Sequence, residues 1–227
     1  MSINIGRRKF VQTAGVAALA GLSSKAVYAD DQKTLIIGIS CSPRKSKTTA
    51  TAVQVALDAA KSFNPNVVVE MIDLGGMEIS GWKPPIPGQK HADDFDSILP
   101  LLKVANLGGI IIGSPVYFRN MSSLCAAFLE RLSVLRKPKL LLADKAVGVL
   151  SVGAYRNGGQ ELVIQQIQTA MLCHESVIVG GKPGAHQGAT LWNTYNDDIL
   201  KDEFGIGSAN KLGLRVAEAS LRIHSEN

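Results

Sequence analysis

The chain has 227 residues, with 24 lysines and arginines against 19 aspartates and glutamates. Residues 1–29 hold four of these cations (Arg7, Arg8, Lys9 and Lys25) and no acid, so residues 30–227, with 20 basic and 19 acidic side chains, are close to neutral. This balance argues against a nucleic-acid-binding protein, and three cysteines are too few for a disulfide-rich scaffold.

The N-terminal segment has the features of an export signal. Two arginines, Arg7 and Arg8, precede a mildly apolar stretch, Val11–Leu22, which is too short and too weakly apolar to span a bilayer. Small and medium residues at 27–29 suit signal peptidase, and the whole segment resembles a twin-arginine signal. We therefore predict a signal peptide over residues 1–29, one folded domain over 30–227, and a periplasmic protein without stable membrane insertion. The twin-arginine pathway carries folded proteins, which suits one that acquires a cofactor before export.

Apolar runs then alternate with amphipathic segments. Strands are predicted near Leu35–Ser40, Val67–Asp73, Gly109–Ser114, Val147–Val152 and Ser176–Val179. Helices are predicted near Lys47–Phe63, Asp93–Val104, Ser122–Leu132, Gln160–Leu172 and Ser208–Ile223. Such βα units indicate an α/β protein with a parallel sheet and helices on both faces. Ligands of these folds bind beyond the carboxyl ends of the strands, so the loops after the first, third and fourth strands are the expected site.

The loop after the first strand is the most informative segment. Within residues 40–49, hydroxyl side chains crowd together with cations, directly before a helix. Free N–H groups and the helix dipole favour an anion at such a place, so the loop predicts phosphate binding. The alternative is an ordinary capped βα turn. Neither the nucleotide P-loop motif nor the dinucleotide motif G-x-G-x-x-G follows the strand, and few glycines suit a phosphate monoester better than a diphosphate.

Two further loops are unusual for surface connections. After the third strand comes a proline, an aromatic pair and an amide, in the sequence SPVYFRNMSS at 114–123. This loop can present a flat apolar surface with a few polar groups. After the fourth strand, the segment 151–161 contains three glycines, which allow the backbone to approach a planar ligand closely.

Together the three loops carry a resemblance. The segments S-x-S-P-R-x-S-x-T, G-S-P-V-Y-F-x-x-M-S-S and G-G-Q-E resemble the flavodoxin-like NADPH-dependent FMN reductase and iron–sulfur flavoprotein family. The resemblance implies a doubly wound five-stranded sheet in the order 2-1-3-4-5, and FMN as cofactor. It implies that the FMN phosphate is held by Ser40, Ser42, Arg44, Ser46, Thr48 and Thr49. It implies that the isoalloxazine ring lies against Pro115, Val116, Tyr117, Phe118, Asn120 and Met121, with Ser151, Gly153, Ala154 and Gly158 covering another edge.

The chain also departs from this pattern. Iron–sulfur members of the family carry a compact cysteine cluster after the second strand, whereas Leu74–Phe95 contains no cysteine. We therefore expect a protein with flavin and without an iron–sulfur cluster. The four histidines lack metal-ligand spacing, no G-x-S-x-G motif occurs, and no side chain is singled out as a catalytic acid, base or metal ligand. The flavin itself is expected to carry the redox chemistry.

Three functions stay open at this point. The first is an FMN-dependent oxidoreductase that passes electrons to a small-molecule acceptor such as a quinone, another flavin or an oxidised metal ion. The resemblance implies NAD(P)H as donor, whereas export favours a membrane quinol or a periplasmic redox protein. The second is a non-enzymatic, flavodoxin-like electron carrier, and the third is a binding protein that has lost the cofactor. The resemblance also implies a homodimer or homotetramer.

Overall fold

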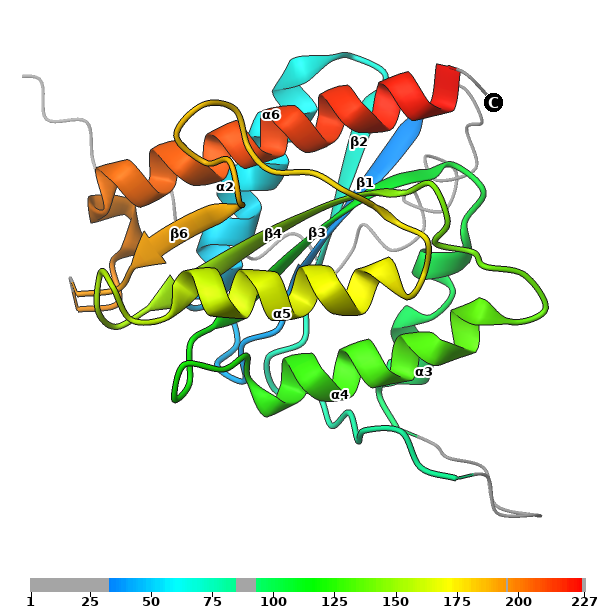
Figure 1. Ribbon diagram of the computed structural model, residues 1–227, viewed down its shortest axis with the longest axis horizontal. Coiled ribbons are helices and arrows are strands. Elements are labelled where there is room, and N and C mark those ends of the chain that lie inside the picture. Colours follow the sequence, from blue (N-terminus) through cyan, green and yellow to red (C-terminus); the bar gives the residue numbers. More distant parts are fainter. Residues whose placement is uncertain (1–32, 85–92, 195, 226–227) are drawn as a thin grey trace, which may run out of the picture.

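The protein is a parallel β-sheet between two layers of helices (Figure 1). The computed structural model describes residues 33–84, 93–194 and 196–225; the predicted signal peptide and residues 85–92 of the cysteine-free segment lie outside these ranges. The strands are β1 (Thr34–Ser40), β2 (Val67–Asp73), β3 (Leu107–Pro115), β4 (Ala146–Gly153), β5 (Val177–Ile178) and β6 (Ala189–Trp192). They form a sheet in the order β2-β1-β3-β4-β5, with β6 also paired to β4, and every one of these pairings is parallel.

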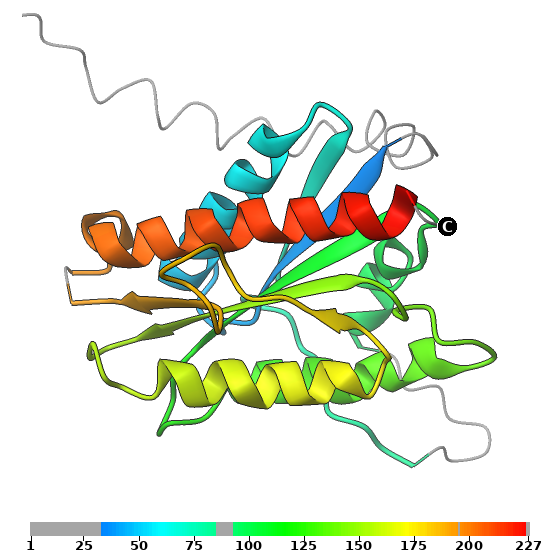
Figure 2. The ribbon, with the colours of Figure 1, turned by 45° about the horizontal axis from the view of Figure 1, so that its top comes forward.

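The helices cover both faces of this sheet. They are α2 (Thr48–Phe63), α3 (Phe95–Ile98), α4 (Ser123–Arg131), α5 (Gln160–Leu172) and α6 (Glu203–Ser225), with short 3-10 helices at Leu101–Lys103, Leu132–Arg136 and Ile199–Lys201. Figure 2 shows α2 and α6 on one face and α4 and α5 on the other. None of the helices in the described ranges combines the length and apolar character needed to cross a membrane.

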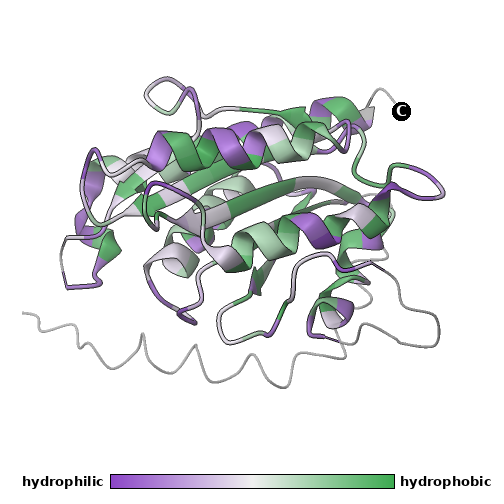
Figure 3. Ribbon diagram, turned by 60° about the horizontal axis from the view of Figure 1, so that its bottom comes forward, coloured by the Kyte–Doolittle hydropathy of each residue, from purple (hydrophilic) through white to green (hydrophobic). Residues whose placement is uncertain are grey.

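Alternating side chains of the strands build two cores. On β1, Ile37 and Ile39 join the core under α4 and α5, whereas Ile36 joins the core under α2 and α6. Both faces are covered by helices, so the strands read as nearly continuous apolar runs (Figure 3). The sequence-based spans of the first four strands therefore agree with the structure to within two residues.

The structure differs from the expected elements in three places. The fifth strand position is shared by the two-residue β5, beside the start of β4, and by β6, beside its end. The helix expected over Asp93–Val104 is broken at Pro100, which has no N–H to continue α3, and a 3-10 turn follows it. Helix α6 begins at Glu203 rather than Ser208. Gly205 and Gly207 have low helix propensity, so the sequence pattern does not indicate the first turn.

The contact between α2 and α6 supplies a first prediction. At Gly213 an added Cβ would lie 1.9 Å from the carbonyl oxygen of Ala56, so Gly213→Ala must push the two helices apart. We expect unfolding free energy to fall by about 2 kcal/mol, or roughly 4–8 °C in Tm. The matched control is Gly207→Ala on the same helix, where nothing beyond the adjacent residues and the backbone of α6 lies within 4 Å of the added carbon, and helix propensity should raise stability by up to about 1 kcal/mol. Equal Tm values for Gly213→Ala and the wild type would contradict this packing.

Candidate cofactor site

Three loops meet where the central strands end. In the sheet register Ser40 lies beside Gly113 and Ser114 lies beside Ser151, so β1, β3 and β4 end side by side. The hydroxyl of Ser122, which begins the turn into α4, donates a 2.6 Å hydrogen bond to the carbonyl of Cys41 and so joins two of the loops. The expectation that the first, third and fourth loops share one edge of the sheet is confirmed.

The start of α2 is open to an anion. Lys47 is the N-cap residue, its side chain accepts no hydrogen bond, and the first turn of the helix contains no acidic residue. The first N–H groups of a helix have no acceptor within the helix, and here no capping side chain supplies one. Thr48 and Thr49 are buried beside these groups. The arrangement fits a phosphate monoester, which supplies the missing acceptor and charge.

Asp73, at the end of β2, fixes the shape of the phosphate loop. One carboxylate oxygen accepts the N–H of Ser46 at 2.6 Å, and the other accepts the N–H of Gly75 at 3.2 Å. Ser46 has a left-handed φ of 54°, and an added Cβ on Gly75 would lie 2.4 Å from the Cα of Lys45. The loop is therefore held from β2 by a residue that the sequence analysis did not select.

The six predicted phosphate ligands occupy different environments. Ser42 is buried and accepts the N–H of Arg44 at 3.2 Å, and the hydroxyl of Ser40 is buried without a hydrogen-bond partner among the described residues. Arg44 forms a 2.8 Å ion pair with Asp197, in the loop after β6, and this hydrogen bond lowers the pKa of Asp197. Arg44 therefore lies at the rim of the loop with an acidic partner that sequence reasoning missed. Contact of these six residues with FMN stays a prediction.

The loop after β3 presents aromatic side chains to solvent. Tyr117 and Asn120 exchange two backbone hydrogen bonds of 2.9 Å, and the two residues between them, Phe118 and Arg119, both have positive φ. This tight turn leaves Phe118 fully exposed and Tyr117 about half exposed (42%), while Pro115 is buried at the end of β3. Exposed aromatic rings at a sheet edge suit stacking on a planar group.

The loop after β4 is held close to the start of α5. The Ser151 hydroxyl donates to the carbonyl of Ser114 at 3.1 Å, and an added Cβ on Gly153 would lie 2.5 Å from Nε2 of Gln160. Ala154 is exposed. The N–H of Gly158 points inward, to Oε1 of Gln160 at 2.9 Å and to the carbonyl of Tyr155 at 3.1 Å.

A cavity of about 510 Å³ lies beside this loop, within the size range of small-molecule sites. It extends between the first turns of α5, β6 and the start of α6. Its lining includes Arg119, Arg156, Gln160, Thr190, Leu191 and Phe204. Two arginines and several amides among few apolar side chains make the cavity polar.

Among the described residues, the cysteine and histidine side chains with shifted pKa values do not form a catalytic cluster, and His224 lies beside Gly108 at the other end of β3. Burial, and then the neighbouring thiol of Cys125, raises the pKa of Cys41 well above its ordinary value, so Cys41 is a neutral core residue. Desolvation lowers the pKa of His174 and of His224. In the parts of the chain that the structure describes, no three His, Cys, Asp or Glu side chains are grouped as metal ligands.

This architecture defines a flavodoxin-like protein, and solved structures share it. The chain superposes on RosB, whose crystal structure contains 8-demethyl-8-formylriboflavin 5′-phosphate, with a TM-score of 0.67, 13% identity and coverage of 85% of this chain and 81% of RosB. It superposes on the NADH:FMN oxidoreductase EmoB with a TM-score of 0.56 and 20% identity, over 86% of this chain and 90% of EmoB. The order of strands and the two helical layers are thus those of the predicted fold class.

Sequence comparison then gives the family. Residues 34–190 match the profile of the NADPH-dependent FMN reductases, and the chain belongs to that family. It is 38% identical to an iron–sulfur flavoprotein of Methanocaldococcus jannaschii over 81% of this chain and 95% of the relative. It is 30% identical to an NAD(P)H dehydrogenase (quinone) of Paracoccus denitrificans over 78% of this chain and 88% of the relative. The protein is therefore an FMN-dependent oxidoreductase.

Proposed function

We propose that the protein binds FMN by its phosphate at the start of α2 and passes electrons to a small acceptor such as a quinone, outside the cytoplasm. The observation that carries the proposal is the uncapped, acid-free start of α2 at the meeting point of three loops. When bound, FMN supplies the two-electron chemistry. The chain's residues hold its phosphate, support its ring and leave a polar cavity alongside.

The proposal specifies a protein without an iron–sulfur cluster. Several relatives are named iron–sulfur flavoproteins, but the segment Leu74–Phe95 of this chain contains no cysteine. Cys41 and Cys125 are buried in the core, and Cys173 lies at the end of α5. Cysteine thiolates are the usual ligands of such clusters, so this chain does not offer the family's ligand set.

Location outside the cytoplasm is the part of the proposal that rests on residues 1–29 alone. The paired Arg7 and Arg8 before the mildly apolar stretch Val11–Leu22 support it. Export also bears on the electron donor. The names of relatives favour NAD(P)H, whereas an exported protein is expected to take electrons from a membrane quinol or a periplasmic redox protein.

The test begins with protein purified from the periplasmic fraction, from which any bound flavin is removed before FMN is titrated into the apoprotein. We expect stoichiometric binding, a yellow holoprotein without iron, and an N-terminus near Asp30. Stopped-flow mixing with NADPH, and separately with a reduced quinone, then identifies the donor, because only a competent donor bleaches the flavin on the timescale of turnover. Steady-state quinone reduction supports an enzyme. Bleaching without turnover would instead indicate an electron carrier, and protein that stays colourless with excess FMN would overturn the proposal.

A further inference from the structure

The loop after β4, residues 154–159, is fixed by side chains from outside it. The carbonyl of Ala154 accepts the indole N–H of Trp192 at 3.0 Å, and the carbonyl of Tyr155 accepts Nε2 of Gln160 at 2.6 Å. These donors belong to β6 and α5. Because the loop has only one backbone hydrogen bond of its own, from Gly158 to Tyr155, its shape depends on the side chains that hold it.

Gln160 makes most of these contacts. The residue is 3% exposed, and its side chain uses both ends of the amide: Nε2 donates to the carbonyls of Tyr155 and, at 3.1 Å, of Leu191, and Oε1 accepts the N–H of Gly158. One buried amide thus joins the loop to β6. The same side chain packs against Gly153, where there is no room for a Cβ. Gly153 and Gly158 are two of the four residues predicted to cover the flavin.

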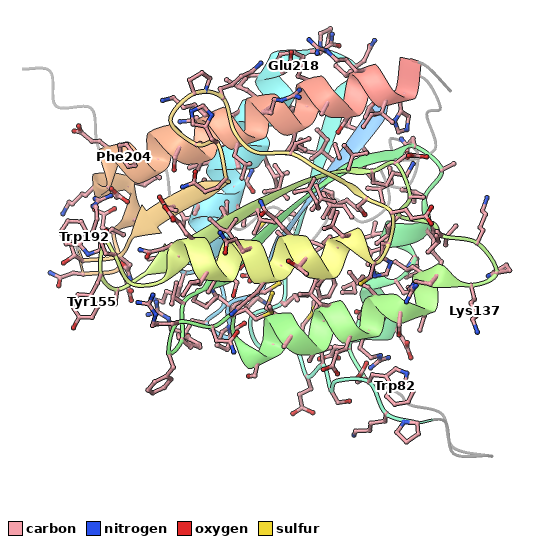
Figure 4. All side chains as sticks on the ribbon, in the orientation of Figure 1. Trp82, Lys137, Tyr155, Trp192, Phe204 and Glu218 are labelled. Carbon is pink, nitrogen blue, oxygen red and sulfur yellow. The ribbon has the colours of Figure 1, made fainter. Side chains whose placement is uncertain are left out.

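A second set of contacts comes from Asp202, directly before α6, and from Phe204 in its first turn. Arg156, in the loop, forms a 2.8 Å ion pair with Asp202, which is 2% exposed and also accepts the N–H of Trp192 at 2.6 Å. The guanidinium lies over the ring of Trp192 at 4.8 Å and over that of Phe204 at 5.8 Å. Figure 4 shows Tyr155, Trp192 and Phe204 together at one end of the molecule. Strand β6 and residues 202–204 therefore support the loop from behind.

We propose that Gln160 is a positioning residue that, with Trp192, sets the distance between the loop after β4 and the flavin, and so sets the reduction potential of the bound FMN. The inference rests on the proposed FMN site. Reduced flavin carries more negative charge than oxidised flavin, and backbone N–H groups fixed beside it stabilise that charge. The Gly158 N–H is already donated to Gln160 and Tyr155, so the groups that would act on the flavin are the other N–H groups of residues 154–159. A loop released from its support would lose this preference for the reduced form.

The experiment compares Gln160→Ala, Trp192→Phe and the wild type by midpoint potential and by FMN dissociation constant. Gln160→Ala is expected to bind reduced FMN about tenfold more weakly, relative to oxidised FMN, which corresponds to a fall of about 30 mV for two electrons. Trp192→Phe removes the indole N–H and leaves a smaller aromatic ring beside Arg156, while the Gln160 contacts stay, so it should shift the potential in the same direction by less. The matched control is Gln168→Ala, also on α5, whose amide donates to the Gln187 carbonyl at 2.7 Å away from the loop; its potential should equal that of the wild type.

The outcomes separate a positioning role from a merely structural one. The inference would be overturned if both variants had a lower Tm, bound oxidised and reduced FMN equally more weakly, and kept the wild-type potential. That result would leave the FMN site intact. If Gln160→Ala does not fold, Trp192→Phe decides the matter, since it removes one hydrogen bond at the surface. Wild-type protein that fails to bind FMN would overturn the proposed function together with this inference.

Discussion

Replacing Lys47 with Asp is expected to weaken FMN binding by at least about a hundredfold while making the apoprotein more stable. Lys47 is the exposed N-cap residue of α2. An aspartate there would accept the N–H groups that the phosphate is predicted to use, and would place a carboxylate beside it. Each charged hydrogen bond contributes about 1.5–3 kcal/mol, so the loss of two accounts for this fold-change. The new cap should add about 1 kcal/mol to the stability of the apoprotein.

The test is specific because FMN affinity should fall while the stability of the apoprotein rises. Binding is measured by quenching of FMN fluorescence, and stability by thermal unfolding of the apoprotein. Lys61→Asp is the matched control, because it makes the same charge change at the other end of α2, where a carboxylate opposes the helix dipole and slightly lowers stability. It should leave FMN binding unchanged. Normal FMN affinity in Lys47→Asp would show that the phosphate does not bind at this helix start.

The second large effect concerns the buried ion pair of Arg131. This residue of α4 is 7% exposed, pairs with Asp93, and donates to the carbonyl of Ser80 at 3.4 Å. Its guanidinium lies 4.7 Å from the ring centre of Phe95. Arg131→Met keeps much of the volume but leaves a buried carboxylate without its cation. We expect unfolding free energy to fall by about 3 kcal/mol, or roughly 6–12 °C in Tm.

This loss should depend on pH. Burial alone would raise the pKa of Asp93, but hydrogen bonds from Ser80, Arg131 and Phe95 outweigh burial and lower it. A carboxylate with a lowered pKa stabilises the folded state fully above its unfolded pKa of about 4, and this contribution disappears as pH falls through the folded pKa. The difference in Tm between wild type and Arg131→Met should therefore be largest near neutral pH and shrink below about pH 4.

The control for this experiment is Arg136→Met, which removes an exposed cation from the 3-10 helix that follows α4. Its effect on unfolding free energy should stay within about 0.5 kcal/mol. A Tm difference for Arg131→Met that is small at neutral pH, or that does not change on acidification, would show that the ion pair with Asp93 contributes little to the fold.

The ion pair of Arg131 belongs to a set of contacts that attach neighbouring segments to α4. Glu130, the neighbour of Arg131, accepts the N–H of Trp82 at 2.7 Å. Two adjacent residues of α4 therefore hold the segment after β2, at Ser80 and Trp82, and the segment before α3, at Asp93. The described parts of this region, 74–84 and 93–95, are thus attached to α4 by polar side chains.

Local sequence pattern was sufficient to predict most of the fold and the edge of the sheet at which the site is expected. Apolar runs such as Leu35–Ser40 predict buried strands because both faces of the sheet are covered, and parallel strands bring their carboxyl ends to one edge. The crowded hydroxyls before α2 indicated an anion site because helix starts have free N–H groups whatever the surrounding fold. The three loop motifs, taken together, indicated the family to which the chain belongs.

The remaining features depend on partners that are distant in the chain. Strand β6 has four residues and forms because the end of β4, about 40 residues earlier, offers an open edge; its own pattern is too short to predict it. Arg44 was predicted to meet phosphate, but its pairing with Asp197, 153 residues away, appears only in the fold. The ion pair between Arg156 and Asp202, 46 residues apart, likewise could not be predicted from local sequence. Helices and strands follow from local periodicity, whereas the side chains that shape the loops are chosen by tertiary contact.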